Sequence, residues 1–323
     1  MQAPPRTEGR DPGIDSFRGL AIVMMVIANY LEHIRVVPGW LKHAPDVGIT
    51  VIDFIAPFFI FAIGLTFGAS VRRRREREGW QRCIEHTVRR AMALAGIGAL
   101  FSLGELGFGF NPGGYPWGTL QAIGVAILLG FPFLFLPWPA RLAAGLALLA
   151  GYQLLVDRVW LARVIAAPQA GLPGTLSWAV LLILATTFAD LSTGGKGASY
   201  LALALLLLAA GIALSPLIPV SKHRMSLSFD LIVTGTGALV SAAFRLSRAA
   251  RLRAMRVLAV WGTNPLLLYV THLVLLAVFL VPAAPRWHVE APVWQAALQG
   301  AAFVALLQAL AWWLHRRRIV VSL

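Results

Sequence analysis

Long apolar segments recur along almost the whole chain and decide what it can fold into. A hydrocarbon layer about 30 Å thick is crossed by roughly 20 apolar residues of α-helix, and segments of about this length follow one another with short polar breaks. Because 58% of the residues are hydrophobic and 13% are charged, no stretch remains for a separate soluble domain. We therefore predict an all-α fold, a polytopic transmembrane helical bundle of about 10 helices. The predicted spans are 17–36, 48–70, 87–104, 117–136, 139–156, 174–190, 197–216, 227–244, 257–281 and 292–314.

Lysine and arginine give this bundle an orientation. Cytoplasmic loops retain these residues more often than translocated loops do. With the N-terminus inside, 21 of the 28 fall on the cytoplasmic side, so both termini are predicted to be cytoplasmic and the net charge of +14 is a topology signal. We expect one domain, residues 1–323, which begins with a short cytoplasmic tail, residues 1–14, and lies as a multi-pass protein in a bacterial cytoplasmic (inner) membrane.

A few polar side chains fall inside or beside the predicted spans, where they are costly unless they face a cavity or the bundle interior. His43, Asp53, Asp230 and His272 all lie toward the outer side and could converge on one site. Asp53 and Asp230 could equally cap their helices, and Gln121 could bond a neighbouring helix. The other members of this set are Asn29, Glu32, His33 and Asn264, and Thr263-Asn264-Pro265 interrupts its span.

Several short motifs along the chain resemble the heparan-α-glucosaminide N-acetyltransferase family of polytopic transmembrane acyltransferases. The most specific block runs from the first span into the second, and later motifs follow in the family's order. The first block comprises Asp15-Ser16-Phe17-Arg18-Gly19, Ala28-Asn29-Tyr30, Lys42-His43-Ala44, Gly48-Ile49-Thr50 and Asp53 to Gly64; the later motifs are Gly118-Thr119-Leu120-Gln121, Ser226-Leu227-Ser228-Phe229 and Gly262 to His272.

The resemblance implies an enzyme that moves an acetyl group from cytosolic acetyl-CoA to a sugar amine or another acceptor across the membrane. It places the catalytic base at His43, with Asn29 beside it, and we assign Asp53 and His272 to orienting the base or the acceptor. The phosphates of CoA should meet cytoplasmic arginines. The residues predicted to bind this donor are Arg18, Gln121, Asn264, Arg89, Arg90, Arg253 and Arg256; no metal is implied.

Departures from the family pattern lie on the outer face and concern the acceptor. Asp46 stands where the family usually has tryptophan, and Ser221-Lys222-His223 replaces an asparagine-lysine pair. We assign acceptor binding to Asp46, Lys222, Ser228 and Asp230. The chain also lacks the large lumenal N-terminal domain of animal members, so we expect a bacterial envelope glycan or a lipid-linked sugar rather than heparan sulfate. Membrane lipids surround the bundle, no nucleic acid partner is expected, and a homodimer is left open.

A transporter is the main alternative to an enzyme. A proton-coupled secondary transporter or a lipid or glycan flippase could use Asp53, Asp230 and His272 as a proton relay. A transporter function does not explain why Asn29, His43 and the Asp53-to-Gly64 motif occur together. A non-catalytic scaffold needs no ionisable groups at membrane depth, and binding of CoA distinguishes the enzyme from both alternatives.

Overall fold

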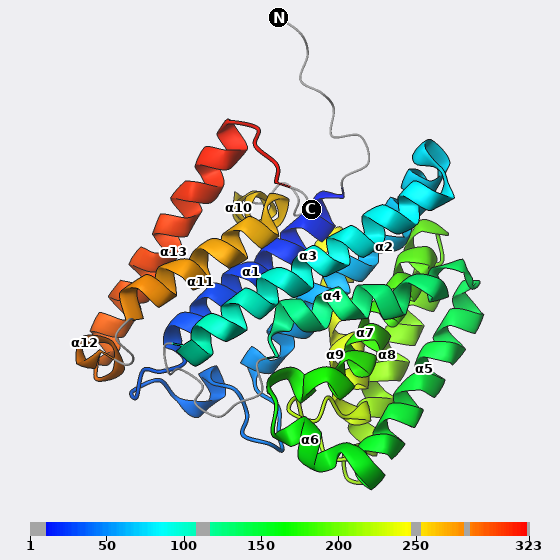
Figure 1. The fold of residues 1–323 in the computed structure, drawn as a ribbon, viewed down its shortest axis with the longest axis horizontal. Helices are drawn as coiled ribbons and strands as arrows, with labels where there is room; N and C mark the ends of the chain where they lie inside the picture. The colour runs from blue at the N-terminus through cyan, green and yellow to red at the C-terminus, as the bar shows by residue number, and fades with distance from the viewer. Residues whose placement is uncertain (1–10, 108–116, 247–252, 281–284, 322–323) are drawn as a thin grey trace, which may run out of the picture.

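A computed structural model describes residues 11–107, 117–246, 253–280 and 285–321, and these residues form a bundle of helices (Figure 1). They contain no strand, only an isolated backbone bridge between Gly48 and Ser221, which confirms the predicted all-α class. The longer helices are α1 (Pro12–Leu31), α2 (Ile55–Glu78), α3 (Trp80–Gly107), α4 (Thr119–Gly130), α5 (Trp138–Leu155), α7 (Gly171–Thr193), α8 (Gly197–Leu214), α9 (Leu227–Leu246), α10 (Arg253–Thr263), α11 (Pro265–Leu280) and α13 (Val293–Arg316). The short helical pieces are η1 (Gly39–Leu41), η2 (Val51–Phe54), η3 (Phe131–Phe135), η4 (Val156–Trp160), α6 (Leu161–Ile165), η5 (Pro168–Ala170) and α12 (Arg286–Val289).

Every predicted span coincides with a helix or with a helix pair. Within the described ranges seven helices are long and apolar enough to cross a membrane, and eight are if the bent pair α10 and α11 forms one span. The other two candidates are α3, whose first turns carry arginines, and the shorter apolar stretch Thr119–Phe135. The predicted number of about ten crossings depends on these two helices.

Helix α7 forms the centre of the bundle. Its residues from Trp178 to Ala185 are almost completely buried, and it packs against α2, α4, α5 and α9. On the other side of α2, α1 packs against α10, α11 and α13 (Figure 1). Helices α1 and α2 thus lie between two groups of helices. One group is α10, α11 and α13, which pack on α1, and the other is arranged around α7, which packs on α2.

Two glycines allow α1 and α10 to cross with their backbones in contact. A Cβ atom on Gly19 would lie 1.8 Å from the carbonyl oxygen of Leu258, and one on Gly262 would lie 1.9 Å from that of Asp15. Both distances are far too short for any side chain, so glycine is required at both positions. Small residues permit such close helix packing in membranes, where apolar burial gives little attraction between helices.

The helix predicted over 257–281 is sharply bent. Helices α10 and α11 meet at 84° around Asn264 and Pro265, as the Thr263-Asn264-Pro265 break indicates. The Asn264 amide binds the segment that follows α13: its Nδ2 donates to the Ile319 carbonyl (2.9 Å) and its Oδ1 accepts from the Val321 amide (2.8 Å). Pro265 has no amide hydrogen, and proline at the start of a helix leaves no bond unmade.

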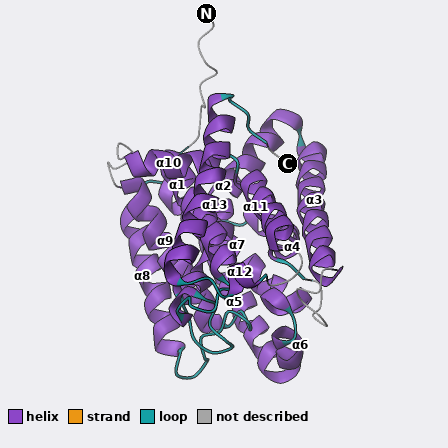
Figure 2. Ribbon diagram, turned by 90° about the vertical axis from the view of Figure 1, so that its left-hand side faces the viewer, coloured by secondary structure: helices purple, strands orange, loops and turns teal. Residues whose placement is uncertain are grey.

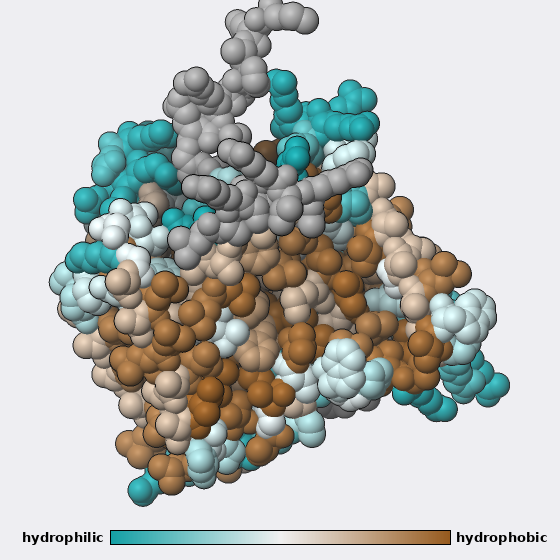
Figure 3. All heavy atoms as spheres, turned by 180° about the vertical axis from the view of Figure 1, so that it is seen from behind, coloured by the Kyte–Doolittle hydropathy of each residue, from teal (hydrophilic) through white to brown (hydrophobic). Residues whose placement is uncertain are grey.

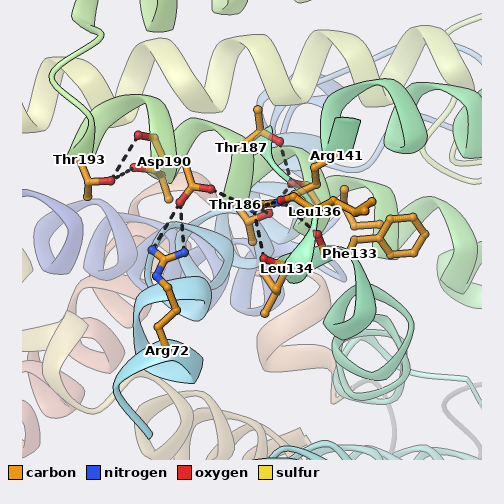
Figure 4. A network of polar contacts seen from close by, with 11 residues as sticks. Arg72, Phe133, Leu134, Leu136, Arg141, Thr186, Thr187, Asp190 and Thr193 are labelled. Atoms are coloured by element: carbon orange, nitrogen blue, oxygen red, sulfur yellow. Dashed lines mark hydrogen bonds and ion pairs between the residues drawn. The ribbon is translucent and has the colours of Figure 1, made fainter. Parts of the chain in front are cut away.

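A buried arginine fixes the turn between η3 and α5. Arg141 donates to the carbonyls of Phe133 (3.1 Å) and Leu136 (2.8 Å) and pairs with Asp190 of α7 at 2.9 Å (Figure 4). Asp190 also faces Arg72 at the end of α2. The charge of Arg141 is therefore compensated although only 2% of the residue is exposed.

The two ends of the bundle differ. The first described residues and the last described residues lie at one end, here called the basic end, together with the arginines that follow Val71 in α2. The longer loops, residues 32–54 and 215–226, gather at the opposite end, here called the loop end (Figure 2). Hydrophobic residues cover the middle of the face in Figure 3, with hydrophilic residues toward its ends. This pattern, with the seven apolar helices, indicates an integral membrane protein.

Candidate active site

The loop that follows α1 is held in shape by one buried carboxylate. Oδ2 of Asp53 accepts hydrogen bonds from the backbone amides of Thr50 (2.9 Å) and Ala44 (3.3 Å), and the Thr50 hydroxyl donates to the Lys42 carbonyl (2.7 Å). Asp53 thereby caps η2, one of the two roles that its position in the sequence suggested. It also fixes the chain on both sides of His43.

The other oxygen of Asp53 binds His43. Nδ1 of His43 lies 2.8 Å from Oδ1 of Asp53, whose side chain is fully buried, whereas 32% of the His43 side chain is exposed. A carboxylate at Nδ1 holds the proton there and leaves Nε2 unprotonated, with a lone pair that can accept a proton. This arrangement orients an imidazole so that it can take a proton from a group at its exposed edge, as in other histidine-carboxylate pairs.

Lys222 reaches the same imidazole from the loop between α8 and α9. Its Nζ lies 3.1 Å from Nδ1 and 3.2 Å from Nε2 of His43, so the ammonium group is close to both ring nitrogens. Burial lowers the pKa of Lys222 to about 8, against the opposing attraction of Asp53 and Glu32. A lysine in this environment can be a charged donor near neutral pH and a neutral amine in mild alkali.

The two loops that carry His43 and Lys222 are joined by backbone and side-chain bonds. The amide of Gly48 donates to the Val220 carbonyl (2.8 Å), and Asp46 pairs with Arg224. The Arg224 hydrogen bond keeps the pKa of Asp46 below its ordinary value. Gly48 has a φ of 124°, which only glycine adopts readily. Asp46 thus holds the loop that presents Lys222.

Asn29 and His272 form a second pair, next to the first. Nδ2 of Asn29, near the end of α1, lies 2.9 Å from Nε2 of the buried His272 on α11. An amide NH₂ group only donates, so Nε2 of His272 accepts and its ring proton belongs on Nδ1. The amide oxygen of Asn29 stays available to another group.

One cavity joins these residues. It encloses about 380 Å³ of space not filled by atoms, part of it open to solvent, and its polar lining includes Asn29, His43 and Lys222. Asp53 and His272 lie behind His43 and Asn29. Thr119, Gln169 and Tyr269 complete the polar wall, and none of the three was predicted from the sequence. Thr119 and Tyr269 fall within the later motifs, but no sequence signal marks Gln169.

The other residues predicted for the acceptor occupy a separate buried cluster. Asp230 is fully buried and bonds the Ser177 hydroxyl, and Ser228 bonds Ser226. Neither residue lines the cavity. Asp53, His272 and Asp230 bond different side chains, namely His43, Asn29 and Ser177. Within the described residues these bonds do not link the three groups of the predicted proton relay into one chain.

The residues predicted to bind the donor also lie in different places, and most of those described bond other parts of the protein. Arg18 pairs with Asp15 and donates to the Gly262 carbonyl, Gln121 accepts from Gly118 and Ser102 at the start of α4, and Asn264 holds the segment after α13. Arg89 is exposed and pairs with Glu85, and Arg256 is exposed on α10. The side chain of Arg253 lies outside the described residues.

Arg90 of this set lines a pocket. Near the basic end, between α2 and α3, a hollow of about 290 Å³ that is partly open to solvent is lined by Arg90 together with Arg74, His86, Ser70 and Thr87. Arginine, histidine and hydroxyl side chains are the groups that bind phosphate in proteins. Ser70 of this pocket and Ala56 of the cavity are both on α2 and lie 14 residues apart, which is roughly 21 Å along a helix.

The fold and the site define a membrane-embedded enzyme with a histidine-carboxylate pair at the loop end. The sequence model described as heparan-alpha-glucosaminide N-acetyltransferase, catalytic, matches residues 10–170. The chain belongs to this family, which confirms the resemblance read from its motifs and implies a transmembrane N-acetyltransferase. Among curated proteins none matches the chain. Asn29, His43 and Asp53 lie inside the matched range, whereas Lys222 and His272 lie beyond it.

Proposed function

We propose that this protein transfers an acetyl group from acetyl-CoA, taken up at the basic end, to a sugar acceptor bound at the loop end. The observation that carries the proposal is the His43–Asp53 pair, which opens into a cavity shared with Asn29 and Lys222. The excess of lysine and arginine at the basic end favours a cytoplasmic location for that end, in a bacterial inner membrane. The donor would then come from the cytosol and the acceptor from the other side.

The distance between the two pockets supports a donor of this length. The pantetheine arm of CoA has about as many backbone bonds as four to five residues of extended chain, hence a reach of roughly 15 Å. With the phosphate on the adenosine of CoA in the Arg74–Arg90 pocket, the pyrophosphate and the pantetheine arm together would bring the thioester toward the cavity, which lies roughly 21 Å farther along α2.

In the proposed reaction His43 acts as the base. Nε2 takes the proton of the acceptor as the acceptor attacks the thioester carbonyl, while Asp53 stabilises the imidazolium through Nδ1. The Lys222 ammonium and the second N–H of Asn29 Nδ2, which is not the one directed at His272, would donate to the oxyanion of the tetrahedral intermediate, since both residues line the cavity. In the substrate-free protein Lys222 lies against Nε2, and we propose that the acceptor displaces it.

The test compares wild-type protein with His43→Ala, using purified protein in detergent, acetyl-CoA and a panel of sugars. His33→Ala is the matched control, because His33 is exposed at the same end. We expect acetyl transfer and thioester loss with the wild type and the control, and a loss of at least about 10²-fold with His43→Ala. Failure of folded wild-type protein to bind any acyl-CoA would contradict the proposal.

A further inference from the structure

The amine of Lys222 lies close to the atom that takes the proton of the acceptor in the proposed reaction. Its Nζ is 3.2 Å from Nε2 of His43, which is within the distance over which a base can take a proton. Both side chains line the same cavity. The nucleophile of an N-acetyltransferase is an amine, and Lys222 carries a primary amine. The chain therefore holds a nucleophile of the same chemical class as the acceptor beside its own base.

The turn that carries Lys222 is held by bonds within residues 221–226. The Met225 amide donates to the Lys222 carbonyl (3.1 Å), and the Ser226 amide donates to the Ser221 carbonyl (3.1 Å). The Ser221 amide in turn donates to the Ser226 hydroxyl (3.0 Å), and both serines are buried. The fold thus presents this lysine to the imidazole from an ordered backbone.

The protonation of Lys222 decides whether it can act as a nucleophile, because an ammonium group has no lone pair. Burial lowers its pKa to about 8, although Asp53 and Glu32 attract the ammonium; His43 and His223 are the other titratable groups beside it. With this pKa about one tenth of the amine is neutral at pH 7, against well under about one in a thousand for an ordinary lysine. A reactive amine is therefore present in the cavity near neutral pH.

We propose that Lys222 is a self-acetylation site, which takes the acetyl group of bound acetyl-CoA when no sugar occupies the cavity. The neutral amine attacks the thioester carbonyl, so that a C–N bond forms and the C–S bond breaks. Nε2 of His43 takes the proton that the amine loses and passes it to the CoA thiolate. The products are an amide on Nζ and free CoA. This assignment rests on the proposed acetyl transfer and adds a second acceptor at the same site.

Acetylation of Lys222 would switch the enzyme off. The amide has no positive charge, so the oxyanion loses one of its two proposed donors, and the added acetyl group takes up space in the cavity. An amide is also far less reactive than a thioester and does not pass its acetyl group on to a sugar. A sugar in the cavity displaces Lys222 from the imidazole and thereby protects it. The modification would then stop the enzyme when the donor is abundant and the acceptor is absent.

The chain contains three lysines, which makes the test selective. Lys42 and Lys196 do not line the cavity, so they report direct chemical acetylation by the thioester. Full-length protein in detergent is incubated with radiolabelled acetyl-CoA and no sugar, and peptide mass spectrometry locates the acetyl group. His43→Ala removes the base, Lys222→Arg removes the nucleophile, and Lys42→Arg is the matched control. The comparison of the three lysines in wild-type protein needs no variant, and melting curves check that each variant is folded.

We expect acetylation of Lys222, not of Lys42 or Lys196, with a rate about 10²-fold lower in His43→Ala and unchanged in Lys42→Arg. The rate should rise about tenfold from pH 7 to pH 9 as the amine loses its proton. Glucosamine should slow the modification. The label should survive hydroxylamine, as an amide does and an acetyl-imidazole does not. Wild-type activity should fall in parallel with the labelling, whereas Lys222→Arg should lose no activity during the same incubation.

Equal labelling of the three lysines, or an unchanged rate in folded His43→Ala, would overturn the self-acetylation site. An unmodified Lys222 in protein that acetylates glucosamine would overturn it too and leave the proposed function standing. Acetylation of Lys222 that needs His43, without transfer to any sugar, would support the site and contradict only the proposed sugar acceptor.

Discussion

The amide of Asn29 lies 2.9 Å from Nε2 of His272 and joins the end of α1 to α11 across the cavity wall. His272 itself does not line the cavity, so we propose that it acts by orienting Asn29. Asn29→Ala is expected to lower kcat about 10- to 100-fold. His272→Ala should cost less, and the double variant should cost less than the product of the two single effects. Fully multiplicative losses of kcat would show that the two residues act independently.

Asp53→Asn tests the carboxylate behind the base. An asparagine fits the space and can still accept from the Thr50 amide, but it cannot stabilise an imidazolium. We expect kcat to fall by about 10²- to 10³-fold with little change in the KM for acetyl-CoA. Asp157→Asn, which changes a carboxylate that accepts from Gln153 (2.8 Å) and does not line the cavity, is the control. A wild-type kcat in Asp53→Asn would remove the histidine-carboxylate pair from the mechanism.

The lowered pKa of Lys222 predicts an alkaline limit of activity. Since burial brings this pKa from its usual value to about 8, the ammonium is present below pH 8 and is lost as the pH rises through it. If the ammonium stabilises the oxyanion, kcat falls above pH 8. Lys222→Arg should move this fall to higher pH because arginine stays protonated. A fall at the same pH in Lys222→Arg would assign the limit to another group.

The crossing of α1 and α10 predicts that Gly262, like Gly19, does not tolerate a side chain. Gly262→Ala places a Cβ within 1.9 Å of the Asp15 carbonyl, so the helices must separate and the bonds of Arg18 to α10 are lost. We expect a large drop in thermal stability, measured by intrinsic fluorescence in detergent. Gly96→Ala on α3 meets open space and should leave the melting temperature unchanged or raise it slightly. Equal melting curves for the two variants would contradict the described crossing.

The helices could be predicted from the sequence because a membrane span must be apolar along its whole length, and this pattern is visible in consecutive residues. Asp53 could be assigned to orienting His43 or the acceptor for the same reason, because the two residues are only ten positions apart in the chain. Lys222 was assigned to the acceptor, but its contact with the imidazole depends on two loops that meet through Gly48 and Val220. No periodic pattern in the sequence predicts that these two distant loops are in contact.

Two further positions show what a local sequence pattern cannot predict. Asn264 lies in a motif that suggested donor binding, yet its amide is used by the backbone of Ile319 and Val321, more than 50 residues later. Gln169 was missed because a left-handed glutamine has no distinct sequence signal, and only the fold brings this residue to the lining of the cavity.

The bridge between Gly48 and Ser221 also bears on how the chain can be divided. The range matched by the family carries Asn29, His43 and Asp53, while Lys222 and His272 come from the second half of the chain. A fragment of residues 10–170 would hold the base and its carboxylate but neither the ammonium group nor the imidazole that orients Asn29. Two inactive halves, produced as separate polypeptides, would regain a complete site only by reassembling in one membrane. Chimeras between relatives would likewise have to exchange loops 42–50 and 220–226 together.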